Sequence, residues 1–441
     1  MIKSTISRTP DDSKHDRVIL YTLMGVLAYV LLGAAVARGW APPKQKSEPA
    51  VRIRLASLGY QSPPQDVLLM NYSTLALQFV DSEHLLLTFN ARGLLRRLPN
   101  DPPEDNDQNV TALLLDAPRS AGSESGKLLA WTEWRLHDHA QYLWRLGQGR
   151  LLLRQGLELR ILAPLEHLGT SQPLSSRLLM TLPNPPVSIQ ISPEGKLMVL
   201  QMENRPGTAD DSVALKMQVG ASLLEKTYDI QFVDLASEAK SADELTYRIG
   251  GEQRSAYPLD IPILPAGYLD LSKVGLDRWH VTFGPAVAGG KRSDLFDVVS
   301  NCRPGLQFIS DDEFVIGGCQ RDPGKFSRGG YTLDGKELWR YDFPEPDGLE
   351  TLKLSDSGNR FALGRILTSY PLSPGQPLSP DLATAQDIRV YEGRSGKQVL
   401  RVQASPMQAD GRNYALSPDG SRLAVVADGD IEVFNLPPTE K

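Results

Sequence analysis

A short motif recurs along this chain and constrains its fold more than any other feature of the sequence. The motif is an apolar strand end, a serine, a tight turn with glycine, and then a new apolar strand. Its three best copies occupy 191–198, 354–362 and 416–424. Glycine supplies the positive φ that a hairpin turn requires. A hairpin that returns every few tens of residues indicates a fold built from repeated units.

The same three units share a later segment in which an Asp-Ile pair precedes further apolar residues. It occupies 229–233, 387–391 and 430–434, where it predicts the third strand of a four-stranded unit. Weaker first hairpins occur at 78–86 and 307–315. The intervals between hairpins fit one or two units of about 40–50 residues each. The sequence therefore predicts an all-β protein with a seven-bladed β-propeller, and it leaves six or eight blades open.

The last unit ends at Leu436, before a fourth strand. An N-terminal strand, taken from either 51–55 or 67–70, is expected to complete it, because an open ring would leave unpaired strand edges. No amphipathic helix is predicted beyond residue 37. We therefore assign 51–441 to one propeller domain.

The Ser-Pro-Asp-Gly turn and the apolar strand after it, at 417–424, resemble the repeats of exported bacterial WD-repeat-like propellers. TolB-type and YVTN-type families are among them. The resemblance extends over roughly residues 70–436 and implies the propeller fold. It implies no particular function, because propellers serve as enzymes, receptors and scaffolds alike.

An uncharged apolar run at 18–37 follows a polar N-terminal tail at 1–17. About twenty apolar residues in a helix span the hydrocarbon core of a bilayer. Residues 35–37, however, read Ala-Val-Ala and match the small residues before a signal-peptidase cut. A retained transmembrane helix and a cleaved signal peptide both stay open. Either one predicts export to the periplasm or the outside of the cell, with a linker at 38–50 and, if the helix is retained, an anchor in the inner membrane.

The two cysteines, Cys302 and Cys319, flank a predicted hairpin. Export would place them in an oxidising compartment, where disulfides form and persist. We therefore expect a disulfide, with two buried thiols as the alternative. A zinc site is disfavoured because no histidine is near and two thiolates alone make a poor site.

No catalytic signature stands out, since the sequence has neither a G-x-S-x-G elbow nor an H-E-x-x-H motif. His137 and His139 flank Asp138, and alternate residues of a strand share a face, so both rings could meet one metal ion. No third ligand is identifiable, which makes them weak candidates beside the simpler interpretation of a polar strand edge. We predict no cofactor, while a calcium or other metal in the central channel stays open.

Loop length is the feature most suggestive of a binding function. The connection from the second strand to the Asp-Ile segment is short in the last unit and much longer in the other two. Such connections share one face of a propeller, so their growth predicts a binding surface, with drift of solvent-exposed loops as the alternative. The candidate binding residues in these loops are Asn204, Arg205, Asp210, Asp211, Tyr370 and Asp381.

We therefore expect an exported, non-enzymatic and monomeric propeller that binds a protein or a glycan through this face. The net charge of −6 argues against nucleic acid, which requires clustered Lys and Arg. One alternative is a propeller enzyme with a central metal, such as a lactonase-like hydrolase or a lyase. Another is a structural component of a cell-envelope complex.

Overall fold

The chain separates into two compact units, Met1–Lys46 and Ser47–Lys441, and the described residues all belong to the second. The computed structural model describes residues 48–69, 74–90, 108–120, 126–136, 141–168, 173–203, 226–235, 246–255, 261–285, 290–319, 326–343, 347–372 and 378–439. The predicted tail at 1–17 and apolar run at 18–37 lie outside them. Within these ranges, no helix combines the length and the apolar character needed to cross a bilayer.

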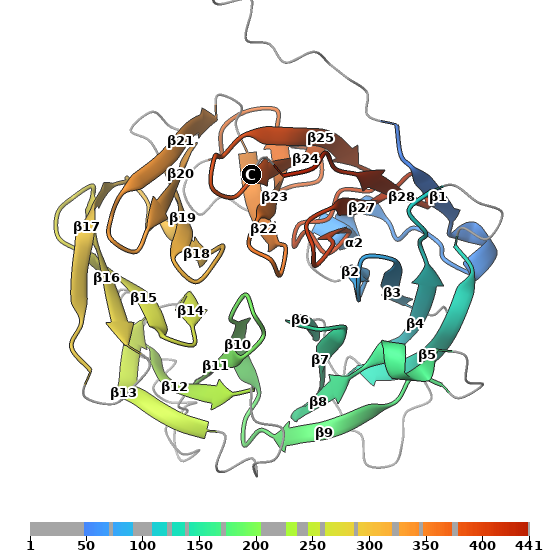
Figure 1. Ribbon diagram of the computed structural model, residues 1–441, viewed down its shortest axis with the longest axis horizontal. Helices are drawn as coiled ribbons and strands as arrows, with labels where there is room; N and C mark the ends of the chain where they lie inside the picture. Colours follow the sequence, from blue (N-terminus) through green and yellow to red (C-terminus); the bar gives the residue numbers. More distant parts are fainter. Residues whose placement is uncertain are drawn as a thin grey trace, which may run out of the picture. The chain divides into compact units, whose positions relative to one another are not determined.

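Seven antiparallel four-stranded sheets form the described part of the second unit, and they stand as blades around a central channel (Figure 1). The strand nearest the channel is the first in each blade. This arrangement confirms the predicted all-β fold and the predicted number of blades. It also confirms the prediction that the Asp-Ile segments are third strands, because they lie within β12, β24 and β28.

In blades 1 to 3, the four strands follow one another along the chain from the innermost to the outermost. Blade 1 contains β2 (Ala76–Phe79), β3 (His84–Asn90), β4 (Gln108–Asp116) and β5 (Leu128–Leu136). Blade 2 contains β6 (Leu143–Gly147), β7 (Arg150–Gln155), β8 (Glu158–Leu162) and β9 (Ser176–Thr181). Blade 3 contains β10 (Pro186–Ile191), β11 (Leu197–Glu203), β12 (Lys226–Asp234) and β13 (Thr246–Ser255).

Blades 4 to 6 follow the same order. Blade 4 contains β14 (Ile263–Leu264), β15 (Gly267–Lys273), β16 (Arg278–Pro285) and β17 (Ser293–Val299). Blade 5 contains β18 (Gly305–Phe308), β19 (Glu313–Cys319), β20 (Phe326–Thr332) and β21 (Glu337–Phe343). Blade 6 contains β22 (Asp347–Leu354), β23 (Arg360–Thr368), β24 (Ala383–Glu392) and β25 (Gln398–Ala404).

Blade 7 takes its outermost strand from the other end of the domain. Its sheet contains β26 (Tyr414–Leu416), β27 (Arg422–Ala427), β28 (Asp430–Asn435) and β1 (Val51–Arg54). β1 pairs antiparallel with β28, and Val51 lies opposite Val433. Of the two candidate strands, 51–55 is thus the one that closes the ring.

The other candidate closing segment, 67–70, does not close the ring, because its described part belongs to a helix. That helix is α2 (Gln65–Leu69), which buries Leu68 and Leu69. Two single-turn 3-10 helices, η1 (Ala56–Leu58) and η2 (Pro164–His167), complete the helical content of the described residues. All three helices are too short to show a helical repeat of apolar residues, so no periodic pattern predicts them.

The repeated motif folds in the same way in each of its three copies. The serine Oγ accepts a hydrogen bond, 2.9–3.1 Å long, from the backbone N–H of the first residue of the second strand. Gly195, Gly358 and Gly420 take φ angles of 67°, 66° and 68°. The serine therefore fixes the turn, and glycine allows its left-handed conformation.

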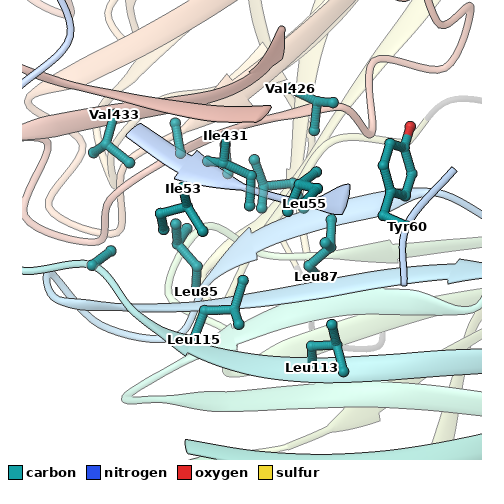
Figure 2. Packing of buried hydrophobic residues seen from close by; sticks show 14 of the residues in the cluster. Ile53, Leu55, Tyr60, Leu85, Leu87, Leu113, Leu115, Val426, Ile431 and Val433 are labelled. Carbon is teal, nitrogen blue, oxygen red and sulfur yellow. The ribbon is translucent and has the colours of Figure 1, made fainter. Parts of the chain in front are cut away.

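Apolar cores fill the interfaces between successive blades. At the closing interface, Ile53 and Leu55 pack with Leu85 and Leu113 of blade 1 and with Ile431 of blade 7 (Figure 2). Comparable clusters join the other neighbouring blades. The burial of apolar surface between blades, which is the main driving force of folding, thus holds the blades in a ring.

The predicted disulfide is also present. Cys302 precedes the inner strand of blade 5 and bonds to Cys319 at the end of β19, with a Cα–Cα distance of 5.5 Å. It ties the connection from blade 4 to the sheet of blade 5.

Candidate functional site

The two faces of the ring differ in the connections that they carry. Antiparallel order in each blade places the turns between first and second strands on one face. The connections between second and third strands lie on the opposite face, together with the connections from one blade to the next. We call this opposite face the insertion face, because the strand ends that flank the long loops predicted from the sequence lie on it.

Exposed large hydrophobic residues gather on the insertion face. Leu276 is 94% exposed in the connection between β15 and β16, and Val274 in that connection and Val299 at the end of β17 are 55% and 58% exposed. The described exposed hydrophobics at strand ends or connections on this face are Leu157, Val187, Val274, Leu276, Val299, Leu349 and Tyr370. The others lie on the outermost strands β5, β9 and β21 and are Leu128, Trp131, Leu178 and Tyr341.

The exposed hydrophobic residues of blade 4 are Val274, Leu276 and Val299, and hydrogen bonds hold the backbone around them. The Val274 N–H donates a hydrogen bond of 3.0 Å to the Arg278 carbonyl, and Val299 pairs with Arg278 from the other side. The Trp279 indole N–H donates to the Ser300 carbonyl at 3.1 Å. These bonds fix the backbone on both sides of the exposed residues, so their side chains are presented in a defined arrangement.

The loop residues predicted from the sequence fall into two groups. Tyr370 and Asp381 are exposed and lie on the insertion face between β23 and β24. Asn204, Arg205, Asp210 and Asp211 lie outside the described residues. The connection between β23 and β24 is shorter than the spacing to the Asp-Ile segment at 387–391 suggests, because β24 begins at Ala383 and continues the pairing with β23.

The metal candidates His137 and His139 also lie outside the described residues. Within the ranges that the structure describes, no three His, Cys, Asp or Glu side chains gather as ligands.

The central channel holds a cavity of about 310 Å³ between the inner strands of blades 2 to 6. Ile, Leu and Phe side chains alternate there with polar ones. The polar and charged lining residues are Gln141, Arg145, Gln190, Gln307 and Lys353. No carboxylate lines it among the described residues, so its charged lining is basic.

Gln190, Gln307 and Lys353 occupy the same position in the inner strands of blades 3, 5 and 6. Each pairs with the third residue of the following strand. Repeats related by rotation about the channel place such residues at similar depth. These three channel-lining residues were not predicted from the sequence. A pattern for them is nevertheless present, because each is a polar residue two positions before the hairpin turn in an otherwise apolar strand.

Arg145 crosses the channel at the end where the inner strands finish. It starts from β6 in blade 2 and donates hydrogen bonds to the carbonyls of Leu416 at 2.7 Å and Leu354 at 3.2 Å. It also forms an ion pair with Asp356. Leu354 and Leu416 end the inner strands of blades 6 and 7, so Arg145 links blade 2 to two blades that are not its neighbours.

Lys353 has a different environment. Its Nζ lies 6.0 Å from the centre of the Tyr414 ring, and no described residue accepts a hydrogen bond from it or forms an ion pair with it. Desolvation is the main cause that lowers its pKa to about 8. Asp410 opposes this shift, while Arg412 and Arg145 add to it. The side chain is half-buried because it is enclosed by protein yet faces the channel.

No protein-family model matches this sequence, and no curated protein matches it either. Similar solved structures include the C-terminal WD40 domain of Sif2, with a TM-score of 0.43, 10% identity, and coverage of 89% of this chain and 99% of that one. The seven four-stranded blades of this chain have the propeller architecture that the sequence resemblance implied. The resemblance expected from the sequence is thus confirmed for the fold.

Two further structures have similar values. An uncharacterized protein of Listeria monocytogenes gives a TM-score of 0.44 at 10% identity and covers 84% of this chain and 97% of its own. A TolB-type protein of Agrobacterium tumefaciens gives a TM-score of 0.37 at 12% identity and covers 70% of this chain and 94% of its own. The seven-bladed arrangement itself is established by the strand pairing in this chain.

Proposed function

We propose that this protein is an interaction propeller that binds a protein partner through its insertion face. The observation that carries the proposal is the gathering of exposed apolar side chains at strand ends on that face. Single exposed hydrophobic residues are normal on any protein surface. Here they recur on one face in blades 2, 3, 4 and 6, and such a bias is typical of protein interaction sites.

The centre of the proposed surface is the blade 4 group of Val274, Leu276 and Val299. Leu276 is almost fully exposed, so its burial by a partner would contribute about 1.5–3 kcal/mol to binding. These three residues are aliphatic. A glycan surface relies more on flat aromatic rings, so this group favours a protein partner over a glycan.

We also propose that the chain is exported, with 18–37 as either an anchor or a signal peptide. The disulfide between Cys302 and Cys319 supports this proposal, because such bonds persist in oxidising compartments. Intact-mass analysis of protein expressed in its own host separates the two forms. Protein that stays reduced and in the cytosol would contradict export.

Affinity capture with the full chain tests the interaction surface. Leu276→Asp should reduce recovery of the partner by about tenfold or more, because a charge in the centre of an apolar contact is left without a partner. Leu178→Asp is the matched control, since Leu178 is exposed on the outermost strand β9. Both variants should keep the melting temperature of the parent protein. Equal recovery with Leu276→Asp and the parent would reject this surface.

A further inference from the structure

The central channel has the dimensions and chemistry of a small-molecule site. Its cavity of about 310 Å³ lies at the lower end of the range for ligand pockets, roughly 300–1,000 Å³. Apolar walls with a few polar groups from different elements are typical of such sites. The lining comes from five blades, which hold it rigidly, so the cavity is formed before any ligand arrives.

Among the residues that the structure describes, the charges around the cavity leave one cation uncompensated. Arg145 is paired with Asp356, and Arg412 is paired with Asp410. Each of these pairs is neutral as a unit. Lys353, by contrast, has no ion-pair partner among the described residues, and the site therefore carries a single excess positive charge.

An unpaired ammonium in such a place is unfavourable for the folded protein. Removal from bulk water destabilises the charged form, and the two nearby arginines add repulsion, which is why the pKa of Lys353 is lowered to about 8. Side chains held in a costly state within a cavity are typical of functional sites. An anion in the cavity would remove the cost by pairing with the ammonium.

We propose that the central channel binds a small organic carboxylate, whose charge pairs with Lys353. A carboxylate fits better than a phosphate, because one excess positive charge matches a monoanion and not a dianion. This site is separate from the blade 4 surface and does not depend on the proposed partner binding.

The amide groups at the same depth indicate what else the ligand carries. The Gln190 Oε1 accepts a hydrogen bond of 2.8 Å from the Ile261 N–H, which fixes the orientation of that amide. The side-chain amide of Gln307 has no hydrogen-bond partner among the described residues and lines the same cavity. Both are neutral groups that recognise hydroxyl or carbonyl oxygens. At about 30 Å³ per water-sized group, the cavity holds a molecule of roughly ten non-hydrogen atoms.

Binding should depend on the protonation of Lys353. The other charged groups near it are Asp410 and Arg412, before β26, and Arg145, from β6; Tyr414 of β26 stays neutral because burial raises its pKa. Affinity for a carboxylate is therefore expected to be constant between about pH 5, where the ligand is ionised, and about pH 7. It should fall as the pH rises through the pKa of Lys353, with the midpoint moved above 8 when the ligand is bound.

Ligand-observed NMR and calorimetry on the full chain test the proposal with benzoate, a hydroxybenzoate and lactate as probes. Benzamide is the matched uncharged probe, and inorganic phosphate, a mixture of monoanion and dianion near neutral pH, is the inorganic anion for comparison. At least one carboxylate should bind, and benzamide and phosphate should bind at least tenfold more weakly. Lys353→Met should reduce carboxylate affinity at least tenfold, while Lys353→Arg should restore part of it.

Lys273→Met is the control variant, because Lys273 is an exposed lysine at the end of β15. It should bind the probes like the parent protein. The proposal is overturned if no carboxylate binds at millimolar concentration, or if Lys353→Met binds as well as the parent. Tighter binding of phosphate than of every carboxylate would also overturn it. The Leu276→Asp variant should bind the probes normally, so failure here is distinct from failure of the partner surface.

Discussion

The serine and the glycine of the repeated hairpin have separate roles, and both roles are local. The serine Oγ accepts from a backbone N–H a few residues later, and the glycine takes a positive φ. Local requirements of this kind are visible in a sequence, which is why the three copies could be recognised. Lys353 shows the opposite case, because its environment is set by blades far away along the chain, and none of the described residues forms an ion pair with it.

Gly420→Ala should destabilise the protein by about 1–3 kcal/mol. Its φ is +68°, and an added Cβ would lie 2.2 Å from the Asn359 Oδ1 atom. Gly429→Ala is the matched control, since Gly429 also has a positive φ, +86°, but nothing lies within 4 Å of an added Cβ. Urea denaturation should show a smaller loss for the control. Equal losses of stability in the two variants would show that the close contact with Asn359 does not add to the destabilisation.

At the scale of elements, strands were predicted more accurately than anything between them. The strands of blades 3, 6 and 7 follow from alternating apolar residues and from turns with glycine. The helix α2 was missed because it has only five residues, Gln65–Leu69. The start of β24 was missed because Ala383 follows a stretch rich in Ser and Pro, and pairing with β23 decides its conformation.

The closing strand offers a prediction at this scale. Ile53→Ala should lower the free energy of unfolding by about 2–4 kcal/mol, because Ile53 is buried between blades 7 and 1. Arg52→Ala, on the same strand, should lower it by at most about 1 kcal/mol, because the Arg52 side chain is 56% exposed in its ion pair with Glu432. Denaturation followed by tryptophan fluorescence measures both. Similar losses would show that β1 does not carry the core of the closing interface.

For the whole molecule, the number of blades could be predicted because repeats reveal themselves by spacing. The lining of the channel could not be predicted, because it comes from five blades and no local pattern indicates which side chains meet there. The insertion face could be predicted in part. Its position follows from strand order, while the exposed group on blade 4 depends on how β15, β16 and β17 end.

The pH dependence of stability is a property of the whole fold that Lys353 should govern. Its pKa falls from 10.5 to about 8 on folding, so the unfolded chain binds more protons between these values. Stability should therefore rise with pH across this window, with the full cost of the charge present below pH 8. Lys353→Met should flatten this rise and be about 1–3 kcal/mol more stable at pH 7. If Lys353→Met and the control Lys273→Met had the same pH profile of stability, the charged form of Lys353 would not destabilise the folded protein.

The pairing of β1 with β28 joins residues as far apart as Arg52 and Glu432, which are separated by 380 positions. On a ribosome, β1 is made before every other strand of the ring and its partner is made last. Contacts of such long range form slowly, because the ends of a long loop must meet first. The nascent chain therefore carries an unmatched strand at its leading end throughout synthesis, and loss of residues at either end of the domain would open the same blade.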